Sequence, residues 1–333
     1  MLNKKFTLAG RPIGRPISDD DFDYKEEELR DLNDRELLLE NMVIEFQPAQ
    51  KGWMEQISNY VAPLEIGDVM RCSGIARVLE TKSEKFKKGD IVIGETCWQT
   101  HPILSQDKVE KVEDESMATK YLGALGGTGL TAYFGVTKIS KPKPGDTVLI
   151  TGAAGGVGSI AGQIFKIAGC KVIGIAGGKE KCDILINEFG FDGAIDYRSD
   201  DLNDSIKKLC PEGVNVLYDN VGGRILNDCL NHLAMNARVA ICGIISRHKT
   251  DNSNFGPENY SNLIFKRATM QGFIVIDYMA EAETARKQIK SWILEGKINC
   301  KEDMQEGFEN APSTLRRLFE SKNKGKQLLK ITD

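Results

Sequence analysis

A glycine-rich heptapeptide at residues 152–158, Gly-Ala-Ala-Gly-Gly-Val-Gly, carries the strongest chemical signal in the chain. It follows the short apolar run Thr-Val-Leu-Ile-Thr and opens a stretch with helical periodicity. Glycines at such a position let the backbone turn sharply and approach a pyrophosphate, which the N–H groups at the start of the helix attract. The loop matches the pattern G-x-G-x-x-G except that Ala153 replaces the first glycine. It therefore predicts a dinucleotide site.

The end of the next apolar run bears on the choice of cofactor. It reads Ile-Ala-Gly-Gly-Lys-Glu-Lys over residues 175–181, with no carboxylate at the strand tip. Proteins selective for NAD usually place Asp or Glu there to bind the ribose 2′-hydroxyl. Lysine instead attracts a 2′-phosphate, and a charge-assisted contact is worth about 1.5–3 kcal/mol. We therefore expect NADP(H), with Tyr197 and Arg198 of the third predicted strand flanking the phosphate.

Two further glycine-containing turns follow predicted strands. Residues 219–223, Asp-Asn-Val-Gly-Gly, follow the fourth strand, and residues 242–246, Cys-Gly-Ile-Ile-Ser, follow the fifth. Open α/β sheets bind ligands at the carboxyl ends of their strands. Either turn alone is consistent with an ordinary connection between a strand and a helix, but together they favour a ligand at that edge.

The elements that must position these turns alternate regularly from residue 147 onward. We predict strands at residues 147–151, 171–175, 193–196, 214–218, 237–242 and 269–276, and helices at residues 157–168, 180–189, 202–209, 224–233 and 281–295. This alternation indicates a doubly wound parallel sheet of the α/β class. The first 120 residues are instead β-rich, with a strand expected at residues 36–46 and strands broken at Gly74 within residues 68–79. Residues 86–94 are expected to form a Gly-Asp turn followed by a short strand, and residues 18–34 a solvated charged face. The tail after residue 298 is expected to complete this first domain.

Composition excludes several functions. The 333 residues suit two domains, and 44 Lys+Arg against 48 Asp+Glu give a net charge of −4, which argues against a nucleic-acid partner. No apolar run reaches the length of a membrane span, and the N-terminus lacks the apolar core of a signal peptide. Eight scattered cysteines are typical of reduced thiols in the cytoplasm. Three histidines are too few for a histidine-rich metal site, and Cys97 with His101 makes only two ligands.

Several motifs in one order resemble a known family. They are residues 129–135 (Gly-Leu-Thr-Ala-Tyr-Phe-Gly), the loop at 152–158, and residues 177–181, 219–223, 242–246, 271–273 and 323–326. The chain resembles the zinc-independent medium-chain dehydrogenases/reductases, and within them the alkenal/one oxidoreductases, which include prostaglandin, leukotriene B4 and curcumin reductases. The resemblance implies a GroES-like β-barrel domain, residues 1–123 completed by 299–333, and a Rossmann NADP-binding domain, residues 124–298. It also implies an active site in the cleft between them and a homodimer.

The resemblance also assigns site residues. The pyrophosphate would lie on Ala154, Gly155, Gly156 and Val157, and the 2′-phosphate on Lys181 and Tyr197. Contacts along the sheet crevice would come from Asn220, Cys242, Gly243, Ile244, Ile245, Ser246 and His248, and contacts near the nicotinamide from Phe273, Ile274, Val275 and Asn323. His248 stands where well-known members have a tyrosine assigned to the enolate, and Tyr260 in the same loop is a rival donor. Both are candidate catalytic residues.

The activity implied is NADPH-dependent reduction of the C=C bond of an α,β-unsaturated aldehyde or ketone, with hydride added to the β-carbon and a proton to the α-carbon. Trp53, Tyr60 and Trp98 are candidates for the wall of an apolar substrate pocket, or alternatively for the core of the first domain. Two other functions stay open at this point. One is a quinone oxidoreductase of the ζ-crystallin type, and the other is a protein that binds NADPH without turnover.

Overall fold

The computed structural model describes residues 1–56, 60–248 and 256–332. The chain divides into two compact units, Met1–Leu122 with Glu302–Asp333 (unit 1) and Gly123–Lys301 (unit 2). The boundaries expected from the sequence, after residues 123 and 298, fall beside these limits. No helix among the described residues has both the length and the apolar character that crossing a membrane requires.

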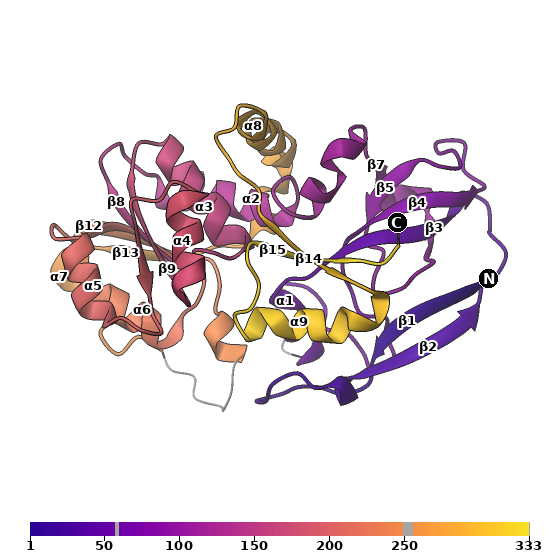
Figure 1. The fold of residues 1–333 in the computed structure, drawn as a ribbon, viewed down its shortest axis with the longest axis horizontal. Coiled ribbons are helices and arrows are strands. Elements are labelled where there is room, and N and C mark those ends of the chain that lie inside the picture. Colours follow the sequence, from indigo (N-terminus) through magenta and orange to yellow (C-terminus); the bar gives the residue numbers. More distant parts are fainter. Residues whose placement is uncertain (57–59, 249–255, 333) are drawn as a thin grey trace. The chain divides into compact units, whose positions relative to one another are not determined.

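Unit 2 is built around a six-stranded, fully parallel sheet with the order β10-β9-β8-β11-β12-β13 (Figure 1). The strands are β8 (Thr147–Thr151), β9 (Lys171–Ala176), β10 (Gly193–Asp196), β11 (Val214–Asp219), β12 (Leu233–Ile241) and β13 (Thr269–Gly272). The chain winds outward in both directions from β8 and β11. The sheet therefore has its topological switch point between these two strands, which is where such folds bind ligands at the carboxyl edge.

Helices cover both faces of this sheet, as the apolar runs of its strands require. They are α2 (Gly127–Phe134), α3 (Gly156–Ile167), α4 (Lys179–Asn187), α5 (Leu202–Leu209), α6 (Gly223–Leu230), α7 (Asn262–Lys266) and α8 (Ala282–Leu294). Helices α5 and α6 cover one face through Ile206 and Leu226, which join the buried cluster around Leu149 and Leu217. On the other face, Phe165 of α3 packs edge-on against Tyr218 of β11.

The last strand is shorter than the sequence predicts. Residues 269–276 form an uninterrupted β-like run, but β13 ends at Gly272, which is the last residue paired with β12. The ring of Phe273 then packs against Tyr218, and a 3-10 helix, Val275–Glu281, follows. The expected strand at residues 273–276 is therefore wrong, because a tertiary contact of Phe273 overrides the β propensity of this segment.

Unit 1 holds two sheets. Strands β1 (Leu2–Leu8) and β2 (Phe22–Glu28) form an antiparallel hairpin. The second sheet has the order β14-β15-β3-β4-β5-β7, with β6 also paired to β3. Its members are β3 (Glu36–Glu45), β4 (Gly74–Thr81), β5 (Ile91–Gly94), β6 (Ile103–Ser105), β7 (Val109–Lys111), β14 (Glu302–Glu306) and β15 (Lys326–Lys330). Since β15 pairs with β3, the C-terminal segment extends a sheet begun near the N-terminus. The described residues of unit 1 also form the α-helices α1 (Ala49–Met54) and α9 (Ala311–Phe319).

The break expected at Gly74 is the start of β4, and before it only an isolated bridge joins Val69 to Thr7. The turn expected before β5 also forms, since the Asp90 carboxylate accepts the Lys87 N–H and Gly89 has φ +92°. The short strand β5 then follows at Ile91. One expectation for unit 1 needs correction. Residues 18–34 are not only a solvated face, because they contain β2. The side chains that follow Phe22 in this strand are nevertheless exposed, as expected of a charged segment.

Candidate functional site

Three helices at the carboxyl edge of the parallel sheet begin without a capping side chain. Helices α3, α4 and α6 follow β8, β9 and β11, and their N-cap residues are Gly155, Gly178 and Gly222. No side chain of the described residues accepts a cap hydrogen bond at these three positions. Helix α5, after the outer strand β10, is capped by the Asp201 carboxylate. These three helices therefore begin at the carboxyl edge of the sheet, and their positive ends favour the negative charge of a ligand there.

The glycine-rich loop after β8 lies directly under the start of α3. A Cβ at Gly158 would stand 2.5 Å from the Gly152 carbonyl oxygen, and a Cβ at Gly155 would stand 3.2 Å from the same atom. Gly152 itself has φ +60°, a conformation that side chains rarely adopt. Any larger residue at Gly158 would push the helix from the loop. The cradle thus has the form that a pyrophosphate requires, with helix N–H groups reached only across glycines.

Ala153 replaces the first glycine of the pattern without strain. It is fully buried, and its N–H donates to the Ile175 carbonyl oxygen of β9. A Cβ at Gly174 would lie 2.8 Å from the Ala153 methyl group. The missing side chain at Gly174 therefore makes room for the methyl group at Ala153, and the departure from the usual pattern leaves the loop intact.

The tips of β9 and β10 form the next part of the edge. A Cβ at Gly177 would lie 2.8 Å from the Tyr197 ring and 2.9 Å from Nε of Arg198, so both side chains lie against this glycine. The Arg198 guanidinium also stands 5.9 Å from the Tyr197 ring centroid. The Asp196 carboxylate accepts the N–H groups of Gly178 and Arg198, which lower its pKa. Its charge is thereby committed to holding the loop.

Lys181 is the third residue of α4 and is half-buried. Its backbone N–H donates to the Gly178 carbonyl oxygen, which places the residue in the first turn of the helix, beside the β9 tip. The cluster predicted for a 2′-phosphate, Lys181 and Tyr197 with Arg198, thus comes from neighbouring tips of adjacent strands.

The loops after β11 and β12 are joined to each other. The Ser246 N–H donates to the Val221 carbonyl oxygen, and a Cβ at Gly243 would lie 3.0 Å from the Asn220 carbonyl oxygen. The side-chain amide of Asn220 donates to the Thr151 carbonyl oxygen at 2.8 Å. Its Oδ1 accepts no hydrogen bond from the described residues and belongs to a half-buried side chain. The amide is therefore oriented with its oxygen available at the crevice.

Under this crevice, Cys242, Tyr218 and Phe273 pack together. The Tyr218 hydroxyl donates to the Thr131 carbonyl oxygen of α2, and its ring meets that of Phe273 edge-on. Burial raises the pKa of the Cys242 thiol to about 12. A raised pKa favours the neutral thiol form of Cys242. The ring of Phe273 is directed into this packing, although the residue is only half-buried.

The two candidate proton donors lie on either side of residues 249–255, which are outside the described residues. His248 ends the 3-10 helix Ile245–His248, which places its backbone two residues beyond Ser246, and its side chain is also outside the described part. Tyr260 is 65% exposed and stands in the turn before α7. The side chain of the preceding Asn259 donates to the Asn227 carbonyl oxygen and to Oδ1 of Asn231, the C-cap of α6. Asn259 is therefore held at the end of α6 away from the glycine turn where that helix begins.

The aromatic candidates in unit 1 divide by burial. Trp98 has no exposed surface and packs on Phe22 and Phe46. It is therefore a core residue of the unit and does not line a pocket. Trp53 in α1 is 7% exposed and belongs to the same cluster, with the Arg71 guanidinium over its ring. Tyr60 is 53% exposed and does not belong to that buried cluster.

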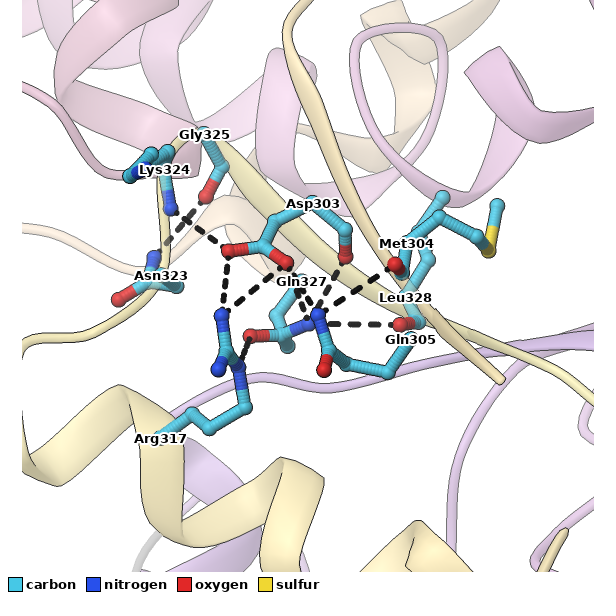
Figure 2. Close-up of polar contacts among 9 residues, drawn as sticks. All are labelled: Asp303, Met304, Gln305, Arg317, Asn323, Lys324, Gly325, Gln327 and Leu328. Atoms are coloured by element: carbon cyan, nitrogen blue, oxygen red, sulfur yellow. Dashed lines mark hydrogen bonds and ion pairs between the residues drawn. The ribbon is translucent and has the colours of Figure 1, made fainter. Parts of the chain in front are cut away.

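Asn323 lies in a loop of unit 1 held by Asp303 (Figure 2). The Asn323 amide donates to the Gly325 carbonyl oxygen, which closes the turn before β15. The Asp303 carboxylate accepts the neighbouring Lys324 N–H and pairs with Arg317 of α9 at 2.9 Å. Burial alone would raise the pKa of Asp303, but these two donors lower it. The loop is therefore fixed by a carboxylate that stays charged.

Among the described residues, no three His, Cys, Asp or Glu side chains lie close enough to hold a metal ion. His101 instead has its Nδ1 2.9 Å from the Thr100 hydroxyl.

Comparison with known proteins assigns the chain to a family. Residues 4–112 match the family model described as the N-terminal domain of oxidoreductase, and residues 156–291 match the one described as zinc-binding dehydrogenase. A putative NADP-dependent oxidoreductase of Bacillus subtilis (strain 168), YfmJ, is 40% identical over 99% of this chain and 98% of its own length. The chain belongs to the medium-chain dehydrogenase/reductase family. Within that family it is a member of the alkenal/one oxidoreductase branch.

Other members of the branch match most of the chain. The NADPH-dependent curcumin reductase of Escherichia coli (strain K12) is 34% identical over 99% of this chain and 97% of its own. The 2-alkenal reductase (NADP(+)-dependent) of Nicotiana tabacum is 36% identical over 89% and 88%. CurA from Vibrio vulnificus, solved in complex with NADPH, superposes with a TM-score of 0.93 at 33% identity, covering 99% of both chains. The fold class expected from the sequence, a Rossmann sheet with a GroES-like domain, is confirmed, and this medium-chain reductase is an NADP-dependent oxidoreductase whose cofactor is NADPH.

Sequence reasoning missed several residues that shape the edge. Asp219 and Thr151 end β11 and β8 and join them through a buried hydrogen bond of 2.5 Å. Gly135 leaves the space that the Tyr218 hydroxyl and the Phe273 ring fill, since its Cβ would lie 2.3 and 2.5 Å from them. Their positions at strand ends and after α2 were readable from the sequence, but their partners lie far along the chain.

Proposed function

We propose that this medium-chain reductase reduces the C=C bond of α,β-unsaturated aldehydes and ketones with NADPH. Two observations support it together. A glycine cradle lies at the switch point of the sheet, and relatives named for curcumin and 2-alkenal reduction are 34% and 36% identical over 99% and 89% of the chain. The substrate class is taken from those names.

The residues present fit the cofactor. Three helix ends without side-chain caps face the edge where the dinucleotide would lie, and a Cβ would fill the cradle at Gly155 and Gly158. The pyrophosphate would be held by the N–H groups of residues 155–157, and the 2′-phosphate by Lys181 with Tyr197. Asn220 would contact the cofactor in the crevice through Oδ1. Backbone groups of residues 242–246 and 273–275 would line the nicotinamide end.

Bound NADPH supplies a hydride to the β-carbon of the substrate. The enolate oxygen that then carries the negative charge needs a hydrogen-bond donor, and the α-carbon needs a proton. We assign this donor to His248, whose backbone follows Ser246 after β12, with Tyr260 as the rival candidate. Hydride and proton transfer complete the reduction, so the scheme needs no covalent nucleophile. Catalysis would rest on orientation and on the stabilised oxyanion.

Product analysis tests the proposal directly. With a 2-alkenal and NADPH, we expect the saturated aldehyde as the product, because hydride adds to the β-carbon. Formation of the allylic alcohol would show addition to the carbonyl carbon instead and would contradict the proposal. With NADPH deuterated at the transferred position, mass spectrometry should locate the label on the β-carbon. In a separate reaction run in D₂O with unlabelled NADPH, the product should instead carry deuterium on the α-carbon.

We also propose that the chain forms a homodimer in the cytoplasm. Strand β13 ends the sheet of unit 2, and its residues Thr269, Gln271 and Gly272 are exposed. Ile276 and Met279, which follow it, are 49% and 50% exposed. An exposed edge strand with apolar neighbours is suited to pair with a second copy. The described cysteines are all free thiols, as a reducing compartment requires. Light scattering should give twice the mass of the chain, and a monomer at micromolar concentration would contradict the dimer.

A further inference from the structure

Asp219 is a buried carboxylate at the switch point for which the proposed chemistry has no use. It is the last residue of β11 and has no exposed surface. Its Oδ1 accepts the Thr151 hydroxyl at 2.5 Å and the Val221 N–H at 3.2 Å, and its Oδ2 accepts the Gly222 N–H at 2.9 Å. One side chain thus joins the end of β8 to the start of α6.

The backbone of the same residue reaches a third strand. Its carbonyl oxygen accepts the N–H groups of Cys242 and Gly243, at 2.8 and 3.1 Å, where β12 ends. The Thr151 hydroxyl, while it donates to the carboxylate, accepts the Asn220 N–H at 2.9 Å. Asn220, whose Oδ1 is available at the crevice, is therefore fixed both through Thr151 and through its neighbour Asp219. Three loops of the proposed cofactor edge meet at this one residue.

Burial of the Asp219 carboxylate is energetically unfavourable for its charged form. Burial raises the pKa of Asp219 to about 6, so the surroundings disfavour its charge, although three donors favour it. Without the carboxylate, the Gly222 N–H at the uncapped start of α6 would be buried and unpaired, as would the Val221 N–H. The stable core of the sheet does not need such a group at this position, since neighbouring strand residues are apolar and equally buried.

We propose that Asp219 is the positioning residue of the NADPH site: through Thr151 and the loops after β11 and β12, it holds Asn220 and residues 242–246 in the arrangement that the cofactor requires. This inference rests on the proposed cofactor site. Asp219 itself is not catalytic, because with no exposed surface it cannot touch cofactor or substrate.

The first experiment compares Asp219→Asn with Asp146→Asn. The amide keeps the size of Asp219 but turns one acceptor into a donor that faces N–H groups. Asp146 offers a matched control at the opposite edge of the same sheet, where its half-buried carboxylate accepts the Lys143 N–H and pairs with Arg238 at 2.6 Å. Both variants should lower the melting temperature. Only Asp219→Asn should weaken NADPH, raising the dissociation constant about tenfold, as loss of one charge-assisted bond implies.

The second experiment uses Thr151, the partner of the carboxylate. Thr151→Val removes the hydroxyl at constant shape, whereas Thr151→Ser keeps it. We expect Thr151→Val to raise the NADPH dissociation constant as Asp219→Asn does, Thr151→Ser to retain wild-type affinity, and the double variant to be no weaker than either single one, since all break one linkage. NADPH fluorescence measures the affinity without substrate, so the readout is independent of turnover.

The outcomes separate the inference from the proposed function. If the wild type binds NADPH and Asp219→Asn binds it equally well, or if Asp146→Asn weakens it as much, Asp219 has only a structural role and the inference is wrong. If Thr151→Ser fails to retain affinity, the linkage through the hydroxyl is wrong. If the wild type itself binds no NADPH, the proposed function fails before the variants are compared.

Discussion

Replacing Lys181 by alanine tests the preference of this reductase for the phosphorylated cofactor. Lys181 lies in the first turn of α4, half-buried, beside the Gly177–Tyr197 packing at the tips of β9 and β10. A 2′-phosphate bound there would lose one charge-assisted contact in the variant. Such contacts contribute about 1.5–3 kcal/mol, which corresponds to roughly a 10- to 100-fold increase in the NADPH dissociation constant.

The same helix supplies a control. Lys179 stands two residues earlier, but its side chain is 85% exposed and pairs with Asp183 within the helix. Lys179→Ala removes the same charge from α4 without touching the proposed phosphate site. It should change NADPH affinity less than about threefold, because exposed charges act weakly through water.

Affinities for NADPH and NADH, measured by nicotinamide fluorescence at equal ionic strength, decide the matter. The Lys181→Ala variant should lose NADPH affinity while that for NADH stays constant, and kcat at saturating NADPH should change little. If both cofactors weaken equally, the lysine acts on the fold rather than on the phosphate. If neither weakens, or if Lys179→Ala has the larger effect, the assignment of Lys181 is refuted.

Three further predictions concern packing, pH and catalysis. Gly162→Ala should destabilise unit 2 by about 1–3 kcal/mol, seen as a lower melting temperature, because its Cβ would stand 1.9 Å from the Phe191 ring; an unchanged melting temperature would contradict this packing. The pKa of Asp219 is raised from 3.8 to about 6, so between these pH values the folded state keeps a proton that the unfolded state releases. The free energy of unfolding of the wild type, relative to that of Asp219→Asn, should therefore fall as pH rises from about 4 to 6 and then level off. An increase over that range would contradict the raised pKa. Of the variants His248→Phe and Tyr260→Phe, the one that removes the enolate donor should have a kcat lowered about 100-fold, with NADPH affinity retained. A variant with unchanged kcat would show that the residue it replaces is not the donor.

Much of unit 2 could be predicted from the sequence because its signals are local. Alternating apolar runs and helical periods placed every strand of the parallel sheet, and the helix at residues 202–209 has the predicted bounds. The alternation also predicted the carboxyl edge of the sheet, where the glycine turns gather. Strand ends were less certain, as β13 shows, because Phe273 leaves the strand for a contact with Tyr218.

What the sequence could not reveal depends on partners distant along the chain. Nothing near Ala153 shows that Gly174 makes room for its methyl group. Asp219 reads as part of a turn, and only the fold brings Thr151 of another strand to its carboxylate. Trp98 was a candidate for a pocket wall because the sequence of a loop-rich segment does not distinguish a buried aromatic residue from an exposed one. In the structure it stacks on Phe22 in the core.

The most direct test of the central claim is the rate of NADPH oxidation with a small set of acceptors. The set contains a 2-alkenal, a medium-chain enone, a bulky dienone and a quinone, each measured also with NADH. The account predicts turnover of at least one enal or enone with NADPH, at a rate well above that with NADH. Turnover of the quinone alone, or binding of NADPH with no oxidation by any of the unsaturated carbonyl compounds, would contradict it.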